Sequence, residues 1–368
     1  MELIMESRPH VSRCFFGCNS AEGFHTFFNF LPDLDNAKMI IVKGGPGTGK
    51  STFINRIGET FAEQGYELEY QHCSLDPESY DAVTIPEIRS VVVAATGHHV
   101  FDPRNPGAVD EILNLGEYWD IDGIRQHREE IIAVNAASER KFHKVYRQLK
   151  AARLLLGNAE SVSAAALKPR QLHAMEQAIC DLLPAANPDA GYGAERHCFI
   201  SSITPLGEVH LAASLLRANT RVVGLVGEPG SGRSELLKQV GRQAQLRGLT
   251  VEYYHKPIDP SVLEHVHIPD AELLLTVQPE LMPEDNLMAV YQLIECAAGW
   301  IKKEMDEISA AKSRYLEILE DAVASLLDAK NTHSALEQYY VPHMDFSGVD
   351  RRREAVEETL KQHSALFA

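Results

Sequence analysis

The chain of 368 residues carries 52 acidic and 35 basic side chains, which gives a formal net charge of −17. Because binding to nucleic acid depends on an excess of Lys and Arg that neutralises phosphates, this balance argues against a nucleic-acid partner. No apolar run approaches the ~18 residues of a membrane span, and residues 1–10 lack the apolar core of a signal peptide. We therefore expect a cytoplasmic protein with no membrane span.

A glycine-rich motif occurs twice in the chain, first in an intact and then in an altered form. Residues 39–52 read MIIVKGGPGTGKST, and residues 222–235 read VVGLVGEPGSGRSE, with Arg233 at the place of Lys50. Identical residues continue beyond both motifs in the same register, without a gap. Gly65, Glu69, Tyr70, His72, Asp76, Pro77, Ile85 and Pro86 recur as Gly248, Glu252, Tyr253, His255, Asp259, Pro260, Ile268 and Pro269. This agreement indicates an internal duplication of a nucleotide-binding unit.

In chain order, each copy predicts a short strand and turn, a helix, the strand before the motif, the helix after it and two further strands. In the first copy, these elements are expected at residues 13–23, 24–31, 39–43, 50–64, 67–72 and 88–95. In the second copy, they are expected at residues 196–207, 208–217, 222–226, 233–247, 250–255 and 271–277. Strands that alternate with helices predict an α/β fold, with a parallel sheet flanked by helices in each copy.

Long helices are expected after each α/β unit. Residues 124–155 and 285–329 contain no Pro, are rich in Ala, Leu, Lys and Glu, and repeat apolar residues at helical spacing. Gly157-Asn158 is expected to end the first helix, and Asn331-Thr332 to interrupt the second. Shorter helices are expected at about 170–183 and 347–364. The predicted domains are an α/β unit with the intact motif, a helical arm with a linker, an α/β unit with the altered motif and a second helical arm. They cover residues 13–120, 121–190, 191–284 and 285–368.

The first motif has the residues of a P-loop, which binds the phosphates of a nucleotide. Backbone N–H groups can surround phosphate oxygens only where the chain adopts conformations closed to bulky side chains, which explains the glycines. The helix that follows directs its N-terminus at the same phosphates. Lys50 is expected on the β- and γ-phosphates, the Ser51 hydroxyl on Mg²⁺, and Thr52 near the α-phosphate. The predicted binding residues are Gly44, Gly45, Pro46, Gly47, Thr48, Gly49, Lys50, Ser51 and Thr52.

The second motif keeps the frame of the loop but changes its chemistry. The residues that keep the frame are Gly227, Gly230, Gly232 and Ser234. Arg233 retains the positive charge, yet a planar guanidinium does not reproduce the geometry of a compact ammonium. Glu235 replaces Thr52 and would repel an anion. Two interpretations remain open: a degenerate site kept for architecture or weak regulatory binding, and a second functional nucleotide site.

Hydrolysis or phosphoryl transfer also needs an acidic residue that holds Mg²⁺ or activates the nucleophile. The third strand of the first copy ends in VVVAATGHH, with no carboxylate. Asp76, in Leu-Asp-Pro after the second strand, is the best substitute, although its recurrence as Asp259 suits a turn-forming role equally well. Asp102, Asp110 and Glu111 follow the third strand, at the edge where ligands of α/β sheets bind. The predicted catalytic residues are Lys50, Asp76 and Asp102.

Nearly the whole chain resembles a family of bacterial proteins, found mainly in spore-forming Gram-positive species, that contain two P-loop units. The resemblance rests on Phe15, Glu22–Phe24, Gly44–Thr52, Asp76–Pro77, His99–Pro103, Pro106–Gly116 and Gly227–Ser234. It implies a tandem ATPase or nucleotide-binding protein. In that family an Asp-Gly-Thr sequence follows the third strand, where this chain has Ala94-Ala95-Thr96. The difference removes the acid that the family would place closest to the metal ion.

The expected function is therefore that of an ATP-binding P-loop protein, a slow ATPase or a nucleotide-driven switch, with one active and one degenerate site. One alternative is a small-molecule phosphotransferase with Asp76 as its base. Another is a non-catalytic nucleotide sensor or scaffold, which the missing acid and Arg233 favour. The absence of an Asn-Lys-x-Asp motif favours ATP over GTP. The expected ligands are ATP and Mg²⁺, and the helical arms suggest a protein partner.

Overall fold

The computed structural model describes residues 9–31, 37–95, 102–186, 189, 191–293 and 302–365. The chain forms two compact units. Unit 1 contains Met1–Gly17, Phe28–Phe142 and Leu326–Ala368, and unit 2 contains Cys18–Phe27 and His143–Ser325. Unit 1 therefore combines the first α/β segment with the C-terminal end of the second helical arm. Unit 2 combines the second α/β segment with the C-terminal end of the first helical arm.

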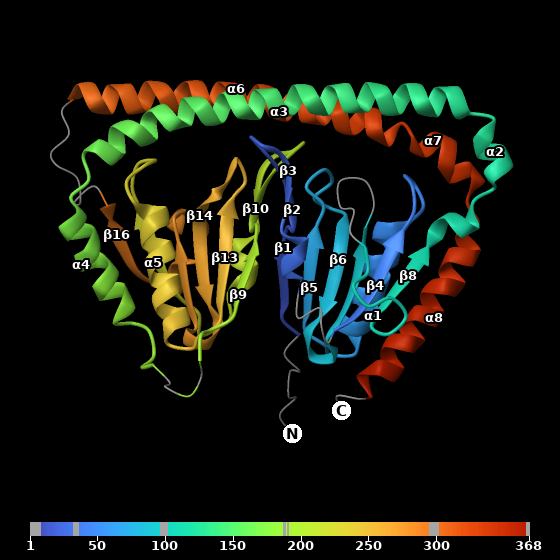
Figure 1. Cartoon of the computed structure of the whole chain (residues 1–368), viewed down its shortest axis with the longest axis horizontal. Coiled ribbons are helices and arrows are strands. Elements are labelled where there is room, and N and C mark those ends of the chain that lie inside the picture. Colours follow the sequence, from blue (N-terminus) through green and yellow to red (C-terminus); the bar gives the residue numbers. More distant parts are fainter. Residues whose placement is uncertain are drawn as a thin grey trace. The chain divides into compact units, whose positions relative to one another are not determined.

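Unit 1 contains a six-stranded sheet in the order β1-β5-β6-β7-β4-β8 (Figure 1). Its strands are β1 (Val11–Cys14), β4 (Lys38–Lys43), β5 (Leu68–His72), β6 (Tyr80–Ile85), β7 (Ser90–Ala94) and β8 (Asp110–Asn114). Strand β6 runs antiparallel to β5 and β7, whereas all the other pairs are parallel. The glycine-rich segment that follows β4 thus begins one strand in from the edge strand β8.

Unit 2 contains a second six-stranded sheet, in the order β16-β12-β15-β14-β13-β9. Its strands are β9 (Glu195–Cys198), β12 (Arg221–Val226), β13 (Val251–Lys256), β14 (Asp259–Ile268), β15 (Leu273–Thr276) and β16 (Leu287–Gln292). Read from β9, this order is the same as that of the first sheet. Strand β14 is antiparallel to both of its neighbours, as β6 is.

Both sheets are therefore mixed, and the α/β class is confirmed while the prediction of parallel sheets is wrong. Strands β6 and β14 were not predicted. Each of them follows its predecessor through a short turn, which contains Asp76 before β6 and ends at Asp259, the first residue of β14. A short turn can join only antiparallel strands, because a parallel neighbour needs a crossover of a dozen or more residues.

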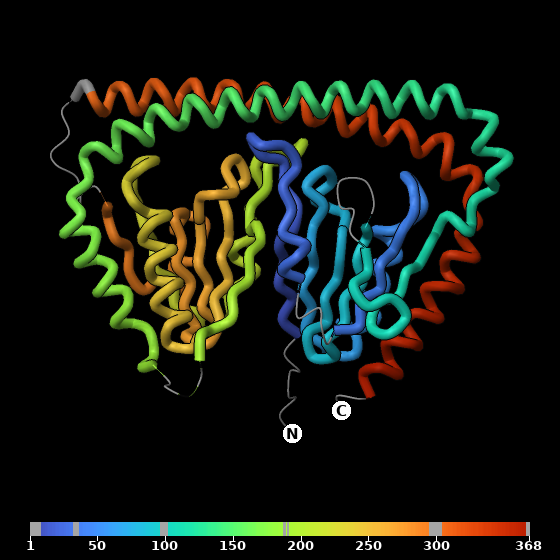
Figure 2. The backbone as a smooth tube through the Cα atoms, in the orientation of Figure 1, coloured from blue at the N-terminus to red at the C-terminus, as the bar shows by residue number. Residues whose placement is uncertain are grey.

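Helices flank both sheets, and their course can be followed in the backbone trace (Figure 2). They are α1 (Lys50–Glu63), α2 (Ile121–Arg125), α3 (Arg128–Ala165), α4 (Pro169–Cys180), α5 (Arg233–Leu246), α6 (Lys302–Ser334), α7 (Glu337–Tyr340) and α8 (Phe346–Ser364). Helix α1 buries Phe53, Ile57 and Phe61 in the core of unit 1, which also takes in Val356 and Leu360 of α8. In unit 2, α4 packs against α5 in the same way. Among the described residues, no helix has the length and hydropathy needed to cross a bilayer.

Two hairpins extend into the ranges where helices were expected, at 24–31 and 208–217, and the helices are reduced to short 3-10 turns at Phe28–Phe30 and Ala212–Leu215. They are β2 (Gly17–Ser20) with β3 (Gly23–Thr26), and β10 (Ser201–Thr204) with β11 (Gly207–His210). In each hairpin a hydroxyl group closes the turn. Ser20 Oγ accepts from the N–H of Glu22 at 3.1 Å, and Thr204 Oγ1 accepts from that of Leu206 at 3.0 Å. This local bonding favours a turn over a helix.

The long helices also differ from their predicted ranges. Strand β16 lies where a helix was expected from residue 285, and its alternating half-buried and exposed residues suit an edge strand beside β12. Helix α3 continues past Gly157-Asn158, because Leu156 and Ala159 on either side are buried and their packing outweighs the ~1 kcal/mol penalty of a helical glycine. Helix α6 continues past Asn331-Thr332, where the Thr332 hydroxyl accepts from Lys141 Nζ at 2.7 Å.

Candidate functional site

The first loop, residues 44–49, connects the carboxyl end of β4 to the N-terminus of α1. Gly47 and Gly49 have φ angles of 66° and 81°, in the left-handed region that favours glycine. Inside the loop, the buried Thr48 donates through Oγ1 to the carbonyl of Gly45 at 3.0 Å. A Cβ atom at Gly44 would lie 2.7 Å from Thr48 Oγ1. The loop is therefore a tight turn that only this pattern of glycines permits.

Lys50 is the first residue of α1, and its side chain folds back onto the loop. Its Nζ donates to the carbonyl oxygens of Gly44 at 3.1 Å and Gly45 at 2.6 Å. Burial lowers the pKa of Lys50, and the negative charges of Asp81 and Glu337 act in the opposite direction. A cation held only by neutral carbonyls gains from the approach of an anion, because charged partners make stronger hydrogen bonds.

Ser51, the next residue, ties the first turn of α1 to strand β6. Its Oγ accepts from the N–H of Tyr80 at 2.8 Å. The hydroxyl is half-buried and retains a proton and a lone pair for a further partner. Thr52, which the sequence also places in the site, is exposed one position further along the helix.

A cavity of about 440 Å³ lies beside the first loop, wholly within unit 1. Residues 46–52 form one wall. The turn before β6 and the strand itself add Cys73, Asp76 and Asp81, and the helices α6 and α7 add Lys330, His333 and Glu337. Gly44 and Gly45 do not line the cavity; Gly45 lies behind it, against the ring of Trp119. The structure therefore brings most of the predicted first-site residues to one cavity.

Asp76 lines the cavity but is already engaged. Its carboxylate accepts from Lys330 Nζ at 2.7 Å and from Ser79 Oγ at 2.6 Å. Burial raises the pKa of Asp76, but these hydrogen bonds outweigh it, so the pKa lies below the ordinary value. Because a general base works best with a pKa near the operating pH, this environment favours the turn-forming role over the base.

The acidic residues after β7 lie elsewhere. The side chain of Asp102 is 88% exposed and makes a loose ion pair with Lys43 at 3.8 Å. Asp110 is buried in β8 and accepts from the N–H of Asn105 at 2.7 Å, while Glu111 pairs with Arg352 at 2.9 Å. None of the three acids lines the cavity. Asp110 and Glu111 lie at the start of β8, which runs parallel to β4, so they lie away from the carboxyl edge that was predicted for them. Asp102 lies near Lys43, at the end of β4, but outside the cavity.

The second loop, residues 227–232, repeats this geometry in unit 2. Gly230 and Gly232 have φ angles of 81° and 89°. Ser234 Oγ accepts from the N–H of Leu263 at 2.8 Å, as Ser51 accepts from that of Tyr80. Arg233 differs from Lys50, since it reaches past the loop and donates to the carbonyl of Val277 at 3.5 Å. Burial lowers the pKa of Arg233, and four surrounding glutamates oppose this effect.

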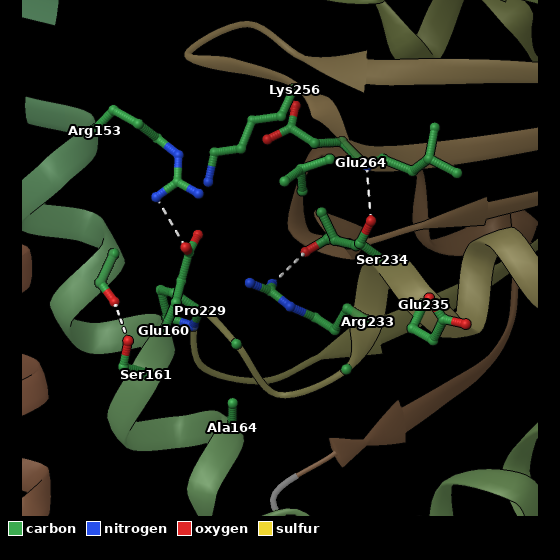
Figure 3. Close-up of a pocket in the computed structure, with 16 residues that line it drawn as sticks. Arg153, Glu160, Ser161, Ala164, Pro229, Arg233, Ser234, Glu235, Lys256 and Glu264 are labelled. Carbon is green, nitrogen blue, oxygen red and sulfur yellow. Dashed lines mark hydrogen bonds and ion pairs between the residues drawn. The ribbon is translucent and has the colours of Figure 1, made fainter. Parts of the chain in front are cut away.

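A cavity of about 520 Å³ lies beside the second loop, within unit 2 (Figure 3). Three cationic side chains, Arg153, Arg233 and Lys256, share it with Glu160 and Glu264. Arg153 pairs with Glu160 at 2.9 Å and, outside the cavity lining, with Asp259 at 2.5 Å. Burial raises the pKa of Glu264 to about 6, and the charge of Lys256 opposes the rise. One ion pair, between Arg153 and Glu160, thus joins two residues of the cavity wall.

Helix segments cover the two loops to different degrees. A Cβ atom at Gly230 would collide with the backbone of α3, at the carbonyl of Glu160 and 2.7 Å from its Cα. At the matching Gly47, the nearest atom is the side-chain Cγ2 of Val341, at 2.8 Å. A side chain can rotate away from an incoming ligand, whereas a helix backbone has to shift. The first loop is therefore the more accessible of the two.

Asp81, Lys330, Glu337 and His333 line the first cavity but were not among the predicted site residues, although the first three left a signal in the sequence. Asp81 recurs in register as Glu264, which lines the second cavity. Lys330 and Glu337 recur at the same spacing as Arg153 and Glu160, which occupy the same places beside the second loop. His333 corresponds to an apolar residue of α3, so it left no such signal.

No protein-family model, curated protein or solved structure matches this chain. Within the part of the chain that the structure describes, no group of three or more His, Cys, Asp or Glu side chains is arranged to hold a metal ion. A Mg²⁺ ion bound with a nucleotide needs only one or two protein ligands, because phosphate and water oxygens complete its shell. The hydroxyl and carboxylate groups around the first loop are compatible with that need. The tandem P-loop family remains a prediction.

Proposed function

We propose that unit 1 binds the triphosphate of a nucleotide, ATP by preference, together with Mg²⁺. One observation carries the proposal: the first loop presents left-handed glycines, a half-buried lysine and a half-buried hydroxyl at the start of a helix, beside an open cavity. The free N–H groups of a helix N-terminus and the loop before it favour an anion.

The roles of the individual residues follow from their positions. The N–H groups of residues 46–51 would surround the phosphates, and Lys50 would exchange its carbonyl partners for phosphate oxygens. The Ser51 hydroxyl would bind the metal ion without losing the N–H bond from Tyr80. The bound nucleotide would supply a phosphoanhydride bond whose cleavage releases free energy.

We further propose that the chain is an internal duplication with one working site. The common strand order supports this proposal, as do two matched contacts, Ser51 with Tyr80 and Ser234 with Leu263. The second site would be degenerate, because Arg233 bonds to the protein itself and α3 rests on the second loop. Helix α6 offers a route to a switch, since its end brings Lys330 to the first cavity.

Of the functions that such a site supports, a slow ATPase or nucleotide-driven switch fits best. A phosphotransferase that uses Asp76 as a base is less well supported, because Lys330 and Ser79 already occupy this carboxylate. A non-catalytic sensor would need the same binding and no turnover. The choice between switch and sensor therefore rests on hydrolysis.

Calorimetric titration of Mg–ATP and Mg–GTP tests the proposal, with hydrolysis followed on the same samples. We expect one ATP to bind to the wild type, to be lost in Lys50→Ala and to be retained in Arg233→Ala. The two substitutions are matched controls, since they remove the equivalent cation from each loop. Absence of binding to the wild type, or loss of binding in Arg233→Ala alone, would contradict the proposal.

A further inference from the structure

The acid that was expected at the end of the third strand is missing from the first cavity. Strand β7 ends at Ala94, which lines the cavity without a charge. Three carboxylates line the same cavity from other elements: Asp76 from the turn after β5, Asp81 from the start of β6 and Glu337 from α7. The position of each relative to Ser51 decides which of them suits a metal ion.

Asp81 lies at the edge of the sheet that carries the first loop, because β6 runs antiparallel to its neighbours β5 and β7. In an antiparallel strand the beginning, rather than the end, lies beside the carboxyl ends of its neighbours. The preceding residue, Tyr80, donates its N–H to Ser51 Oγ at 2.8 Å, so Asp81 follows directly on the contact with the first turn of α1. The Cys73 thiol donates a hydrogen bond to the Asp81 carboxylate, which helps to hold it at this edge.

The other two carboxylates are less suitable. Asp76 is bound by the ammonium of Lys330 and the hydroxyl of Ser79. Glu337 is exposed, and its Cβ would lie 3.5 Å from a Cβ on Gly47, over the loop and not beside the first turn of α1. Asp81 is thus the acid that lines the cavity next to the contact between β6 and Ser51.

In unit 2, different side chains occupy the positions that match Asp81 and Cys73. Glu264 stands in register with Asp81, and Lys256 stands in register with Cys73. Both side chains point into the second cavity, together with Arg233 (Figure 3). In unit 2 a lysine thus accompanies the carboxylate, where unit 1 has a neutral thiol. The fixed ammonium group supplies a positive charge beside the carboxylate. It can attract an approaching phosphate without the help of a metal ion.

We propose that Asp81 and the Ser51 hydroxyl together hold the Mg²⁺ ion that accompanies the triphosphate in unit 1, and that Lys256 makes the pocket of unit 2 independent of a metal ion. The inference rests on the proposed function of unit 1. Carboxylate and hydroxyl oxygens are the ligands that Mg²⁺ prefers, and two of them leave room for phosphate and water. A metal site of this kind escapes a search for acids at strand ends.

Calorimetry of ATP binding, with Mg²⁺ and with EDTA, tests the role of Asp81. In the wild type we expect removal of Mg²⁺ to weaken binding about 10- to 100-fold, the effect of a charged contact. Asp81→Asn should bind Mg–ATP as weakly as the wild type binds ATP in EDTA. Asp122→Asn, at an exposed acid on α2, should behave as the wild type. Paramagnetic resonance of Mn²⁺ gives a second readout: the ATP complex of Asp81→Asn should hold Mn²⁺ more weakly than that of the wild type.

A second variant tests the comparison with unit 2 and does not depend on Asp81→Asn folding. Cys73→Lys places an ammonium beside Asp81, as Lys256 stands with Glu264, and Cys73→Ser is its control. We expect Cys73→Lys to bind ATP in EDTA about 10-fold more tightly than the wild type, and to hold Mn²⁺ more weakly in its ATP complex. Thermal unfolding verifies that both variants fold.

The possible failures can be told apart. If ATP binds to the wild type, and Asp81→Asn retains the same dependence on Mg²⁺ and the same bound Mn²⁺, the metal lies elsewhere and this inference is wrong, while the proposed function stands. A Cys73→Lys variant that still requires Mg²⁺ would overturn the role of Lys256. If the wild type binds no ATP with or without Mg²⁺, both proposals fall.

Discussion

Replacement of Gly230 by alanine tests whether helix α3 rests on the second loop. Gly230 has a φ angle of 81°, and an added Cβ would collide with the α3 backbone at Glu160. The left-handed conformation costs an alanine about 1–2 kcal/mol. Relief of the collision requires a shift of the helix, and overpacking of this kind typically costs a further ~1–3 kcal/mol. We therefore expect Gly230→Ala to lower the free energy of unfolding by about 2–5 kcal/mol.

Two other glycines separate these contributions. Gly207 has a φ angle of 101° and no atom within 4 Å of an added Cβ, so Gly207→Ala measures the backbone cost alone in the same unit. Gly47→Ala is the counterpart in unit 1, where the exposed side chain of Val341 can rotate away. Both variants should lose only about 1–2 kcal/mol.

Urea denaturation followed by circular dichroism measures these differences. Because two units need not unfold together, hydrogen exchange of peptides from α3 is recorded alongside. Gly230→Ala should speed exchange around residues 157–164, and Gly207→Ala should not. Equal destabilisation by Gly230→Ala and Gly207→Ala, with unchanged exchange in α3, would refute the close contact and with it the view that the second loop is closed.

Two further predictions concern acidic residues. Burial raises the pKa of Glu264 to about 6, so this carboxyl group binds a proton more tightly in the folded than in the unfolded chain. It therefore lowers the free energy of unfolding as the pH rises from about 4.5 to 6. Glu264→Gln should add about 2 kcal/mol to the free energy of unfolding at pH 8 but little at pH 4. Urea unfolding at the two pH values checks this, and an equal gain at both would contradict it. Asp76→Asn should slow phosphate release less than about 10-fold, because Asp76 forms a turn and does not act as a base. If Asp76 were the general base, its loss would slow the reaction about 10²- to 10⁴-fold. Steady-state assays with Mg–ATP distinguish the two outcomes.

The parts of the fold that the sequence predicted well are those with strong local signals. Strand β4, the first loop and α1 follow from an apolar run, a set of glycines and a helical repeat of Phe53, Ile57 and Phe61. The same signals predicted β12 and α5. Strand β16 was misread as helix because its apolar residues also suit a helical repeat, and only pairing with β12 decides in favour of a strand.

The candidate site was only partly predictable, because its remaining residues depend on long-range structure. Asp81 was missed because the direction of β6 cannot be read from its own sequence, and a search at strand ends looks at the wrong side of an antiparallel strand. Lys330 and Glu337 lie far along the chain from the first loop, and their place depends on how α6 and α7 fold into unit 1. Asp102 pairs loosely with Lys43 at the end of β4 and does not line the cavity, which no local pattern in the sequence indicates.

Hydrogen exchange with a non-hydrolysable ATP analogue and Mg²⁺ tests the central claim most directly, since it reports on both loops in one sample. Binding in unit 1 alone predicts slower exchange in peptides that cover residues 44–52 and in the end of α6 near Lys330, with no change in residues 227–235. Lys50→Ala should abolish the protection. Protection of the second loop, or of neither loop at a saturating concentration of the analogue, would contradict the claim that this chain has one working nucleotide site.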